Sequence, residues 1–183
     1  MKMVFPLLIT CFISLSFWCN SNKSCFDTKP DFVSIIDGRT TIKYQSIKCE
    51  ISLKHLDPEF NFNNSNLPVN RLEYQWSVCF DNDRDGNFDI IFAVSNFKLP
   101  DDTPQRGSIK DFTQSNVWEI GEDSNTSLDF LHTRVEGNSI ILESLRWHKQ
   151  LDKITDHSTI KYKSFYNDGS TIFTDSIVVN GLK

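Results

Sequence analysis

Alanine and methionine are almost absent from this chain of 183 residues: alanine occurs only as Ala93, and methionine only as Met1 and Met3. Alanine is the strongest helix former, whereas phenylalanine, which occurs 15 times, is enriched in β-strands. This balance argues against a helical protein. It favours a fold that is built from half-buried strands.

A long run of basic residues is also lacking, and the formal net charge is −5. Such a chain offers no basic patch that would bind nucleic acid or an anionic membrane surface. The motifs H-E-x-x-H and G-x-S-x-G and the phosphate-binding P-loop are missing as well, so the sequence carries no signature of these enzyme classes. We therefore expect a protein that is not an enzyme and does not bind nucleic acid.

The N-terminal segment is apolar from Val4 to Trp18, and Lys2 is its only charged residue. A spanning helix needs about 20 residues, so this shorter run is more typical of a signal peptide. We expect the protein to be exported and therefore extracytoplasmic. The predicted organisation is a leader over residues 1–21, a short linker over residues 22–30 and a single domain over residues 31–183.

The processing of this leader has three alternatives. Small residues at the −3 and −1 positions allow a cut before Asn22, which would release a secreted protein. Cys19 lies where the lipidated cysteine of a lipoprotein would lie, directly after the apolar run, although the bulky Trp18 precedes it. Lipidation of Cys19 would attach the protein to a membrane at the cell surface. An uncleaved N-terminal anchor is the third alternative.

Three cysteines follow the leader, Cys25, Cys49 and Cys79. A disulfide between two of them is compatible with an exported protein, and its connectivity stays open. Cys49 continues an alternating apolar pattern, so it is also interpreted as a buried thiol. No C-x-x-C pair is present, and the cysteine spacing matches no zinc site.

Apolar residues recur with a period of two along most of the remaining chain, which predicts β-strands. The clearest strand is Leu72 to Phe80, where Trp76 belongs to the core row. Further strands are expected at 32–36, 41–53, 88–97, 117–120, 128–135, 139–142, 159–166 and 171–179. Only Glu143 to Ile154 has a helical pattern. The prediction is an all-β, antiparallel β-sandwich of about eight to ten strands with one short helix, preceded by the signal segment.

Two details of the N-terminal strands are predicted from turn chemistry. Asp37-Gly38 is a dipeptide typical of two-residue hairpin turns, so we expect a turn there. The apolar register of the following strand shifts after Tyr44, which predicts a β-bulge near Gln45 and Ser46.

The segment from Asp81 to Asp89 has the form D-x-D-x-D-G-x-x-D. Calcium takes about six to eight hard oxygen ligands, and alternate residues of a tight loop direct their carboxylates inward. Gly86 provides the sharp turn. The expected metal ligands are the four carboxylates of the loop and the backbone carbonyl of an asparagine: Asp81, Asp83, Asp85, Asp89 and Asn87.

This loop differs from an EF-hand, because position twelve is Phe92 instead of a glutamate and strands flank it on both sides. The β-hairpin version of the loop, which ends at the ninth position, fits. We interpret the loop as a structural Ca²⁺ site. The alternative is an acidic, solvated hairpin turn without a metal.

Tyr74 to Val78 has the form Y-x-W-x-V and leads into this aspartate-rich loop and a second strand. The hairpin resembles one that recurs in exported β-sandwich modules, among them DOMON-like domains and family 9 carbohydrate-binding modules. Asp31–Ile35 and Arg134–Leu142 are similar to flanking segments of these modules. The resemblance implies a sandwich over about residues 30 to 180 that binds a sugar or another small ligand. Haem ligation by methionine, as in some DOMON domains, is excluded because both methionines lie in the leader.

Trp118 and Trp147 are the candidate ligand-binding residues, because an exposed indole ring stacks on a sugar; the alternative is that both are core residues. The expected function is an exported, calcium-binding β-sandwich that binds a glycan or another extracellular ligand without catalysis. One alternative is a surface adhesion module with a protein partner and a purely structural ion. Another is a small glycan hydrolase that uses the loop carboxylates at 101–102 and 122–123.

Overall fold

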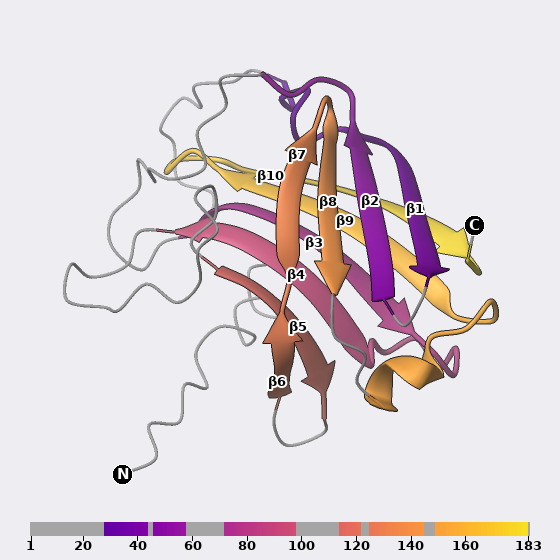
Figure 1. Ribbon diagram of the computed structural model, residues 1–183. Coiled ribbons are helices and arrows are strands. Elements are labelled where there is room, and N and C mark those ends of the chain that lie inside the picture. The colour runs from indigo at the N-terminus through magenta and orange to yellow at the C-terminus, as the bar shows by residue number, and fades with distance from the viewer. Residues whose placement is uncertain are drawn as a thin grey trace, which may run out of the picture.

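The computed structural model describes residues 28–43, 46–57, 72–97, 114–121, 125–144 and 149–182. These residues form two antiparallel β-sheets that face each other as a sandwich (Figure 1). The predicted all-β sandwich is therefore confirmed. The leader, including Cys19, lies outside the described residues, as do Trp147 and Cys25. Over the residues that are described, no helix combines the length and the apolar character needed to cross a membrane.

One sheet has four strands and the other has six. The four-stranded sheet has the order β1 (Ile35–Lys43), β2 (Ser46–Leu53), β8 (Ser139–Ser144) and β7 (His132–Glu136). The six-stranded sheet has the order β10 (Ile172–Asn180), β9 (Thr159–Asn167), β3 (Leu72–Asp81), β4 (Ile90–Phe97), β5 (Gln114–Ile120) and β6 (Asn125–Phe130). The strand β3, which the sequence predicts most clearly, thus lies in the interior of the larger sheet.

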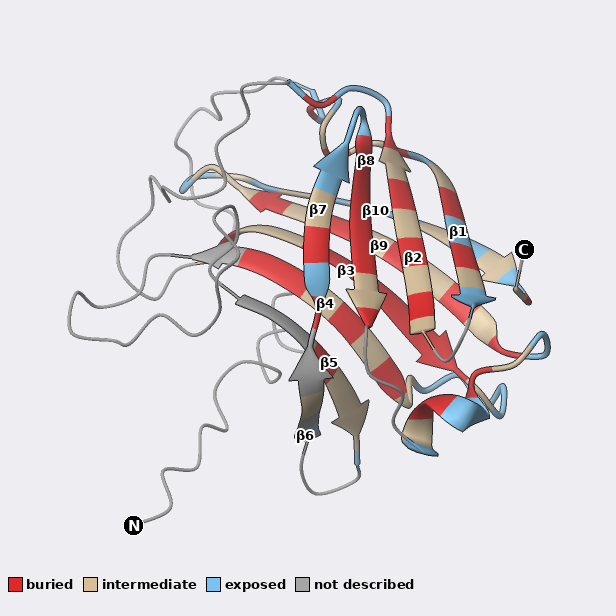
Figure 2. Ribbon diagram, viewed as in Figure 1, coloured by how far each residue is buried: buried red, intermediate tan, exposed pale blue. Residues whose placement is uncertain are grey.

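The core fills the space between the sheets, and Figure 2 shows its buried residues alternating along the strands. The alternation follows from the pleat, which directs every second side chain to the same face. The four-stranded sheet contributes the row Ile47, Cys49, Ile51 and Leu53 from β2. The six-stranded sheet contributes Trp76, Val78 and Phe80 from β3 and Ile90, Phe92 and Val94 from β4. Trp76 is 1% exposed, so its assignment to the core is confirmed.

The prediction of a turn at Asp37-Gly38 is wrong, because β1 runs through both residues. The glycine serves packing: a Cβ on Gly38 would come within 2.6 Å of three atoms of the Tyr162 ring. Lys43 pairs with Ser46, so β1 and β2 form a hairpin in place of one long strand. Over the described residues, the irregularity in this pairing lies between Ile35 and Asp37. Gln45, where a β-bulge was predicted, lies outside them.

The single strand expected over 128–135 is two strands in different sheets. Strand β6 ends at Phe130, Leu131 is buried between the sheets, and β7 begins at His132. The consecutive apolar pair Phe130-Leu131 breaks the period of two. That break marks the point where the chain passes from one sheet to the other.

The helix expected over 143–154 is shorter than predicted. Glu143 and Ser144 complete β8, and the described helical residues form one 3-10 helix, η2 (Lys149–Lys153). Leu151 and Ile154, which belong to the predicted apolar side of this helix, are both buried in the core. The prediction of an apolar side is therefore confirmed for these two residues, whereas residues 145–148 of the predicted helix lie outside the described residues.

Cys49 and Cys79 are both buried and both free thiols. They belong to different sheets, since Cys49 lies in β2 and Cys79 in β3. The interpretation of Cys49 as a buried thiol is confirmed, and burial raises the pKa of its thiol to about 12.

Candidate functional site

The aspartate-rich loop connects β3 to β4 at one end of the six-stranded sheet (Figure 1). Asp81 is the last residue of β3, and Asp89 directly precedes β4. The backbone N–H of Asp89 donates to the carbonyl of Phe80 at 2.8 Å, which closes the loop at its base. Two neighbouring core strands therefore hold the two ends of the loop.

Three of its carboxylates converge on one point. Asp81, Asp83 and Asp89 each offer a carboxylate oxygen, and these oxygens lie within 4.8 Å of one another. Asp81 is buried at 5% exposure, Asp89 is half-buried and Asp83 is exposed. The group is thus anchored inside the hairpin and open to solvent on one side, which an entering cation requires.

Backbone N–H groups of the loop orient the buried carboxylate. Asp81 accepts from the N–H of Arg84 at 2.7 Å through Oδ1 and from the N–H of Gly86 at 3.1 Å through Oδ2. Both donors belong to residues with a left-handed backbone, since φ is 63° at Arg84 and 92° at Gly86. Glycine adopts this conformation without strain, whereas arginine does so rarely. The predicted sharp turn at Gly86 is confirmed, and Arg84 is a second one that the sequence pattern did not indicate.

The other two carboxylates of the group are held in the same way. Asp89 accepts from the N–H of Asn82 at 2.7 Å, and Asp83 accepts from the N–H of Asp85 at 3.1 Å. Each uses one oxygen in these bonds. A carboxylate oxygen has two lone pairs, so acceptor capacity remains for a further ligand.

Asp85 and Asn87, which are also predicted ligands, bind each other. Asp85 accepts from the backbone N–H of Asn87 at 2.7 Å and from its side-chain amide at 3.0 Å. The side-chain bond from Asn87 is the main reason why the pKa of Asp85 is lowered, and the backbone bond adds to it. The structure therefore brings together Asp81, Asp83 and Asp89, and it leaves the Asp85 carboxylate outside that group.

Arg84 does not turn toward the acids of the group. Its Nε donates to the carbonyl of His157 at 2.5 Å, on the segment that precedes β9. The Arg84 guanidinium group therefore does not offset the like charges of the three carboxylates, which are left to the backbone N–H groups, to solvent or to a cation. Hard oxygen ligands in this arrangement suit Ca²⁺.

A long-range contact that local sequence patterns do not reveal ties the loop to the rest of the domain. The hydroxyl of Ser158 is buried and donates to Oδ1 of Asn82 at 2.9 Å. The same hydroxyl accepts from the N–H of Thr155 at 3.0 Å. Asn82 and Ser158 are 76 positions apart in the chain, so no short-range motif could have indicated this pair.

The predicted ligand-binding tryptophans are not assembled into a site by the described residues. Trp118 lies in β5, is half-buried and pairs with Ile91 of β4. Strand alternation places it on the face of the sheet that points away from the core, because its neighbour Val117 is buried in the core. Trp147, the lipidation candidate Cys19 and the loop acids at 101–102 and 122–123 lie outside the described residues.

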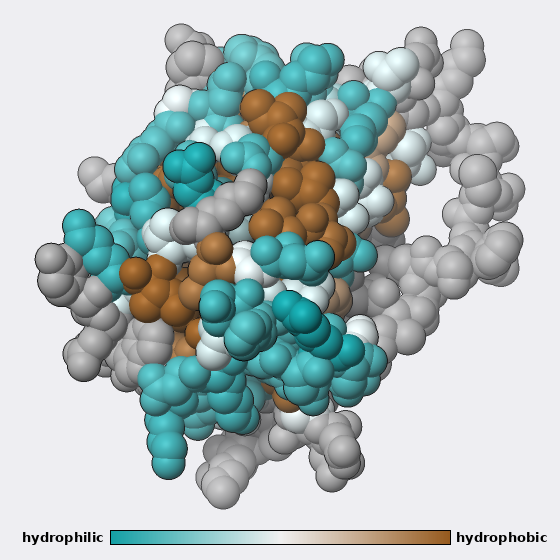
Figure 3. All heavy atoms as spheres, turned by 90° about the vertical axis from the view of Figure 1, so that its right-hand side faces the viewer, coloured by the Kyte–Doolittle hydropathy of each residue, from teal (hydrophilic) through white to brown (hydrophobic). Residues whose placement is uncertain are grey.

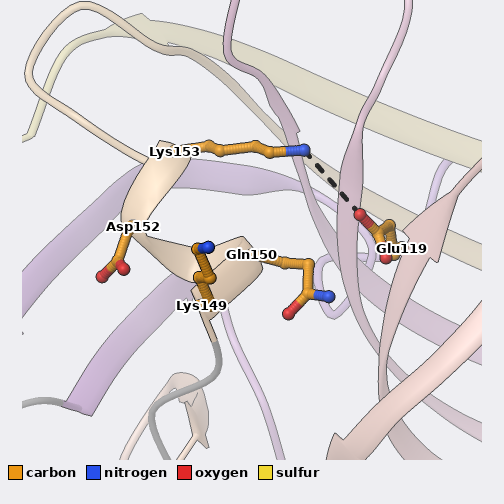
Figure 4. Close-up of a pocket in the computed structure, with 5 residues that line it drawn as sticks. All are labelled: Glu119, Lys149, Gln150, Asp152 and Lys153. Carbon is orange, nitrogen blue, oxygen red and sulfur yellow. Dashed lines mark ion pairs between the residues drawn. The ribbon is translucent and has the colours of Figure 1, made fainter.

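A charged hollow of about 370 Å³ lies between β5 and η2. Figure 4 shows Lys153 extended toward Glu119, and their charged groups are 3.8 Å apart. Asp152 points away from Glu119 in this view. The two acids therefore do not face each other across the hollow as the carboxylate pair of a glycosidase does.

No protein-family model matches this chain, and the comparisons with curated proteins and with solved structures give no match either. The resemblance to DOMON-like domains and family 9 carbohydrate-binding modules therefore stays a prediction.

Proposed function

We propose that this chain is an exported β-sandwich that binds Ca²⁺ in the loop from Asp81 to Asp89 and, without catalysis, binds an extracellular ligand. The observation that carries the metal proposal is the convergence of three carboxylate oxygens within 4.8 Å. The backbone hydrogen bonds to Asp81, Asp83 and Asp89 support it, because they hold the carboxylates in place before an ion arrives.

The role of the ion is structural. Asp81 ends β3 and Asp89 precedes β4, so a cation bound to both would clamp the two strands at the loop end of their hairpin. Asp83 would close the coordination from the solvent side. Ca²⁺ is favoured over Mg²⁺ because a loop of this kind tolerates irregular geometry, whereas Mg²⁺ demands a near-octahedral shell.

Isothermal titration calorimetry on chelator-treated protein tests the metal proposal. We expect one Ca²⁺ per chain, weaker binding of Mg²⁺, and a loss of at least about tenfold in Ca²⁺ affinity for Asp83→Asn. Asp152→Asn is the matched control, because Asp152 is an exposed aspartate outside the loop. The metal proposal is wrong if wild type takes up no Ca²⁺, or if both variants bind it equally well.

Export and lipid attachment form a separate part of the proposal, which rests on the leader sequence. The intact mass of protein recovered from membrane and soluble fractions tests it. A lipidated chain would begin at Cys19 with added acyl mass and would lose the membrane association in Cys19→Ala. A cut before Asn22 would give an unmodified soluble chain, and an uncleaved chain in the cytoplasm would contradict export.

A protein partner is the second candidate, and exposed apolar residues on the edge strands favour it. Ile36 on β1 is 65% exposed, and Ile172 and Val178 on β10 are 45% and 57% exposed. Figure 3 shows apolar patches within a largely hydrophilic surface on the side where β1 and the C-terminus lie. Edge strands with apolar side chains are common pairing surfaces. In this alternative the ion would only stiffen the hairpin.

A further inference from the structure

A second hollow, of about 390 Å³, lies on the six-stranded sheet, on the face that points away from the core. Residues of β3, β9 and β10 line this groove: Gln75, Ser77, Lys161, Lys163, Ser164, Phe165, Thr174, Asp175 and Ser176. Its volume falls within the range of about 300–1,000 Å³ that is usual for small-molecule sites. None of its lining residues belongs to the aspartate loop or to the hollow beside η2.

Strand alternation decides which side chains face the groove. Ser164 donates its hydroxyl to the carbonyl of Val33, and Asp175 accepts from the N–H of Ile35 at 2.8 Å. Both side chains thus point to the core side, toward the start of β1. The other seven side chains face the groove, and all of them except Phe165 can form hydrogen bonds: Gln75, Ser77, Thr174, Ser176, Lys161, Lys163 and Phe165.

Gln75 is the strongest single indication of a ligand. Its Oε1 is buried and has no hydrogen-bond partner. An unsatisfied buried acceptor is costly, so such an atom in a folded protein needs an explanation. Gln75 pairs with Phe165 on β9 and Ser95 on β4, so it sits within the sheet with strands on both sides. Gln75 lines the groove, so a rotation of its side-chain amide would bring Oε1 to a ligand hydroxyl there and supply the missing hydrogen bond.

The charge of the groove is positive, in a protein whose net charge is −5. Lys161 and Lys163 are its charged side chains on this face, since Asp175 is engaged with Lys29 at 2.9 Å on the other side. Lys163 also lies over the ring of Phe88, with its Nζ 4.8 Å from the ring centroid. The electrostatic complement of this face is an anion.

We propose that this groove binds a sugar-sized polyhydroxylated carboxylate, of the uronic acid class. The inference rests on the ligand-binding part of the proposed function and specifies its chemistry. The hydroxyl groups of the sugar would bind Gln75 and the Ser and Thr hydroxyls. The carboxylate would bind Lys161 and Lys163, and the ring of Phe165 would contact the apolar C–H face of the sugar.

Titration with glucuronate, followed by backbone amide NMR shifts and by calorimetry, tests the proposal. We expect saturable shifts on β3, β9 and β10. Glucose and acetate should bind more weakly than glucuronate, since glucose lacks the carboxylate and acetate lacks the sugar hydroxyl groups. Gln75→Leu is expected to weaken glucuronate binding by about tenfold, because the amide loses its hydrogen bonds. Lys161→Met is expected to weaken it by a similar factor and to reduce its dependence on salt.

Matched controls come from the hollow beside η2. Gln150→Leu and Lys153→Met make the same chemical changes outside the groove and should leave glucuronate binding unchanged. Circular dichroism and thermal melting establish that each variant is folded. Binding that is absent in the wild type, or that acetate reproduces in full, would overturn the proposal. Equal binding to the groove variants and to their controls would overturn it as well.

Glucuronate binding in the groove and Ca²⁺ binding in the aspartate loop can be tested independently of each other. Asp83 does not line the groove, so Asp83→Asn should bind glucuronate like the wild type. Loss of Ca²⁺ binding with retained glucuronate binding would leave the groove proposal standing. Retained Ca²⁺ binding without any glucuronate shifts would refute the groove proposal alone.

Discussion

Two hairpin turns of this protein are built from aspartate, asparagine and glycine, and only one of them assembles a candidate metal site. The loop between β3 and β4 contains Gly86 with φ of 92°, and the turn between β9 and β10 contains Gly169 with φ of 94°. In the second turn, Asp168 accepts from the N–H of Ser170 at 2.8 Å and from the N–H of Thr171 at 2.6 Å. Among the described residues, Asp168 belongs to no group of three or more potential metal ligands.

The difference lies in how many carboxylates meet, not in the composition of the turn. Asp168 uses a single oxygen for its backbone bonds and for the Ser170 hydroxyl. In the first loop, Asp81, Asp83 and Asp89 also accept backbone N–H groups, but their oxygens in addition face one another. A turn that is rich in aspartate is therefore no metal site unless its backbone directs several carboxylates to one point.

The largest effect is expected for Asp81→Ala. This change removes a metal ligand together with the acceptor of the Arg84 and Gly86 N–H groups. We expect a loss of about 1–3 kcal/mol in the free energy of unfolding without calcium. Added Ca²⁺ should then fail to stabilise the variant. Urea denaturation in chelator and in excess Ca²⁺ measures both effects, and a full response of the variant to Ca²⁺ would exclude Asp81 as a ligand.

A smaller and calcium-independent effect is expected for Asp168→Ala in the comparison turn. The Ser170 and Thr171 N–H groups would lose their acceptor, at a cost of about 1 kcal/mol. The loss should be the same in chelator and in Ca²⁺, since no other carboxylate is expected to share this turn with a metal. If Ca²⁺ changes the free energy of unfolding of Asp168→Ala by a different amount than that of the wild type, Asp168 takes part in metal binding. The two turns would then not differ in the way described above.

The smallest effect is expected for Asp85→Ala. Asp85 is exposed and its carboxylate is bound to Asn87, outside the group of three. We expect the Ca²⁺ affinity to change by less than about threefold. Calorimetry compares it with Asp83→Asn, and equal losses in the two variants would show that Asp85 joins the coordination when calcium binds.

Much of the larger sheet could be predicted from the sequence, because most of its strands keep a period of two. Strand β3 is the clearest example, since Trp76, Val78 and Phe80 form one buried row as expected. Prediction was wrong where a residue serves a distant contact. Asp37-Gly38 is typical of a turn, but Gly38 is needed because the Tyr162 ring leaves no space for a Cβ. Tyr162 lies 124 positions later in the chain (162 − 38).

The candidate site was predicted in composition and only partly in geometry. The motif identified all members of the loop, because the alternation of aspartates is a local pattern. It could not separate Asp85 from Asp83, since the bond from Asn87 that holds Asp85 depends on the path of the backbone. The groove on the outer face was not predicted, because strands far apart in the sequence supply its residues.

The central claim is that three converging carboxylates form a calcium site that stabilises the hairpin. Thermal unfolding of the wild type and of Asp83→Asn, each in chelator and in Ca²⁺ at about 100 times its dissociation constant, tests this claim most directly. Calcium should stabilise the wild type by about 2.7 kcal/mol, which raises its melting temperature by about 5–10 °C.

The account predicts that Asp83→Asn is less stable than the wild type only when Ca²⁺ is present. In chelator, Asp83→Asn should melt at the same temperature as the wild type or slightly above it, because one of three like charges is removed. In Ca²⁺, the variant should melt several degrees below the wild type, because a ligand is lost. A shift with Ca²⁺ that is equal in the two proteins, or absent from both, would contradict the claim.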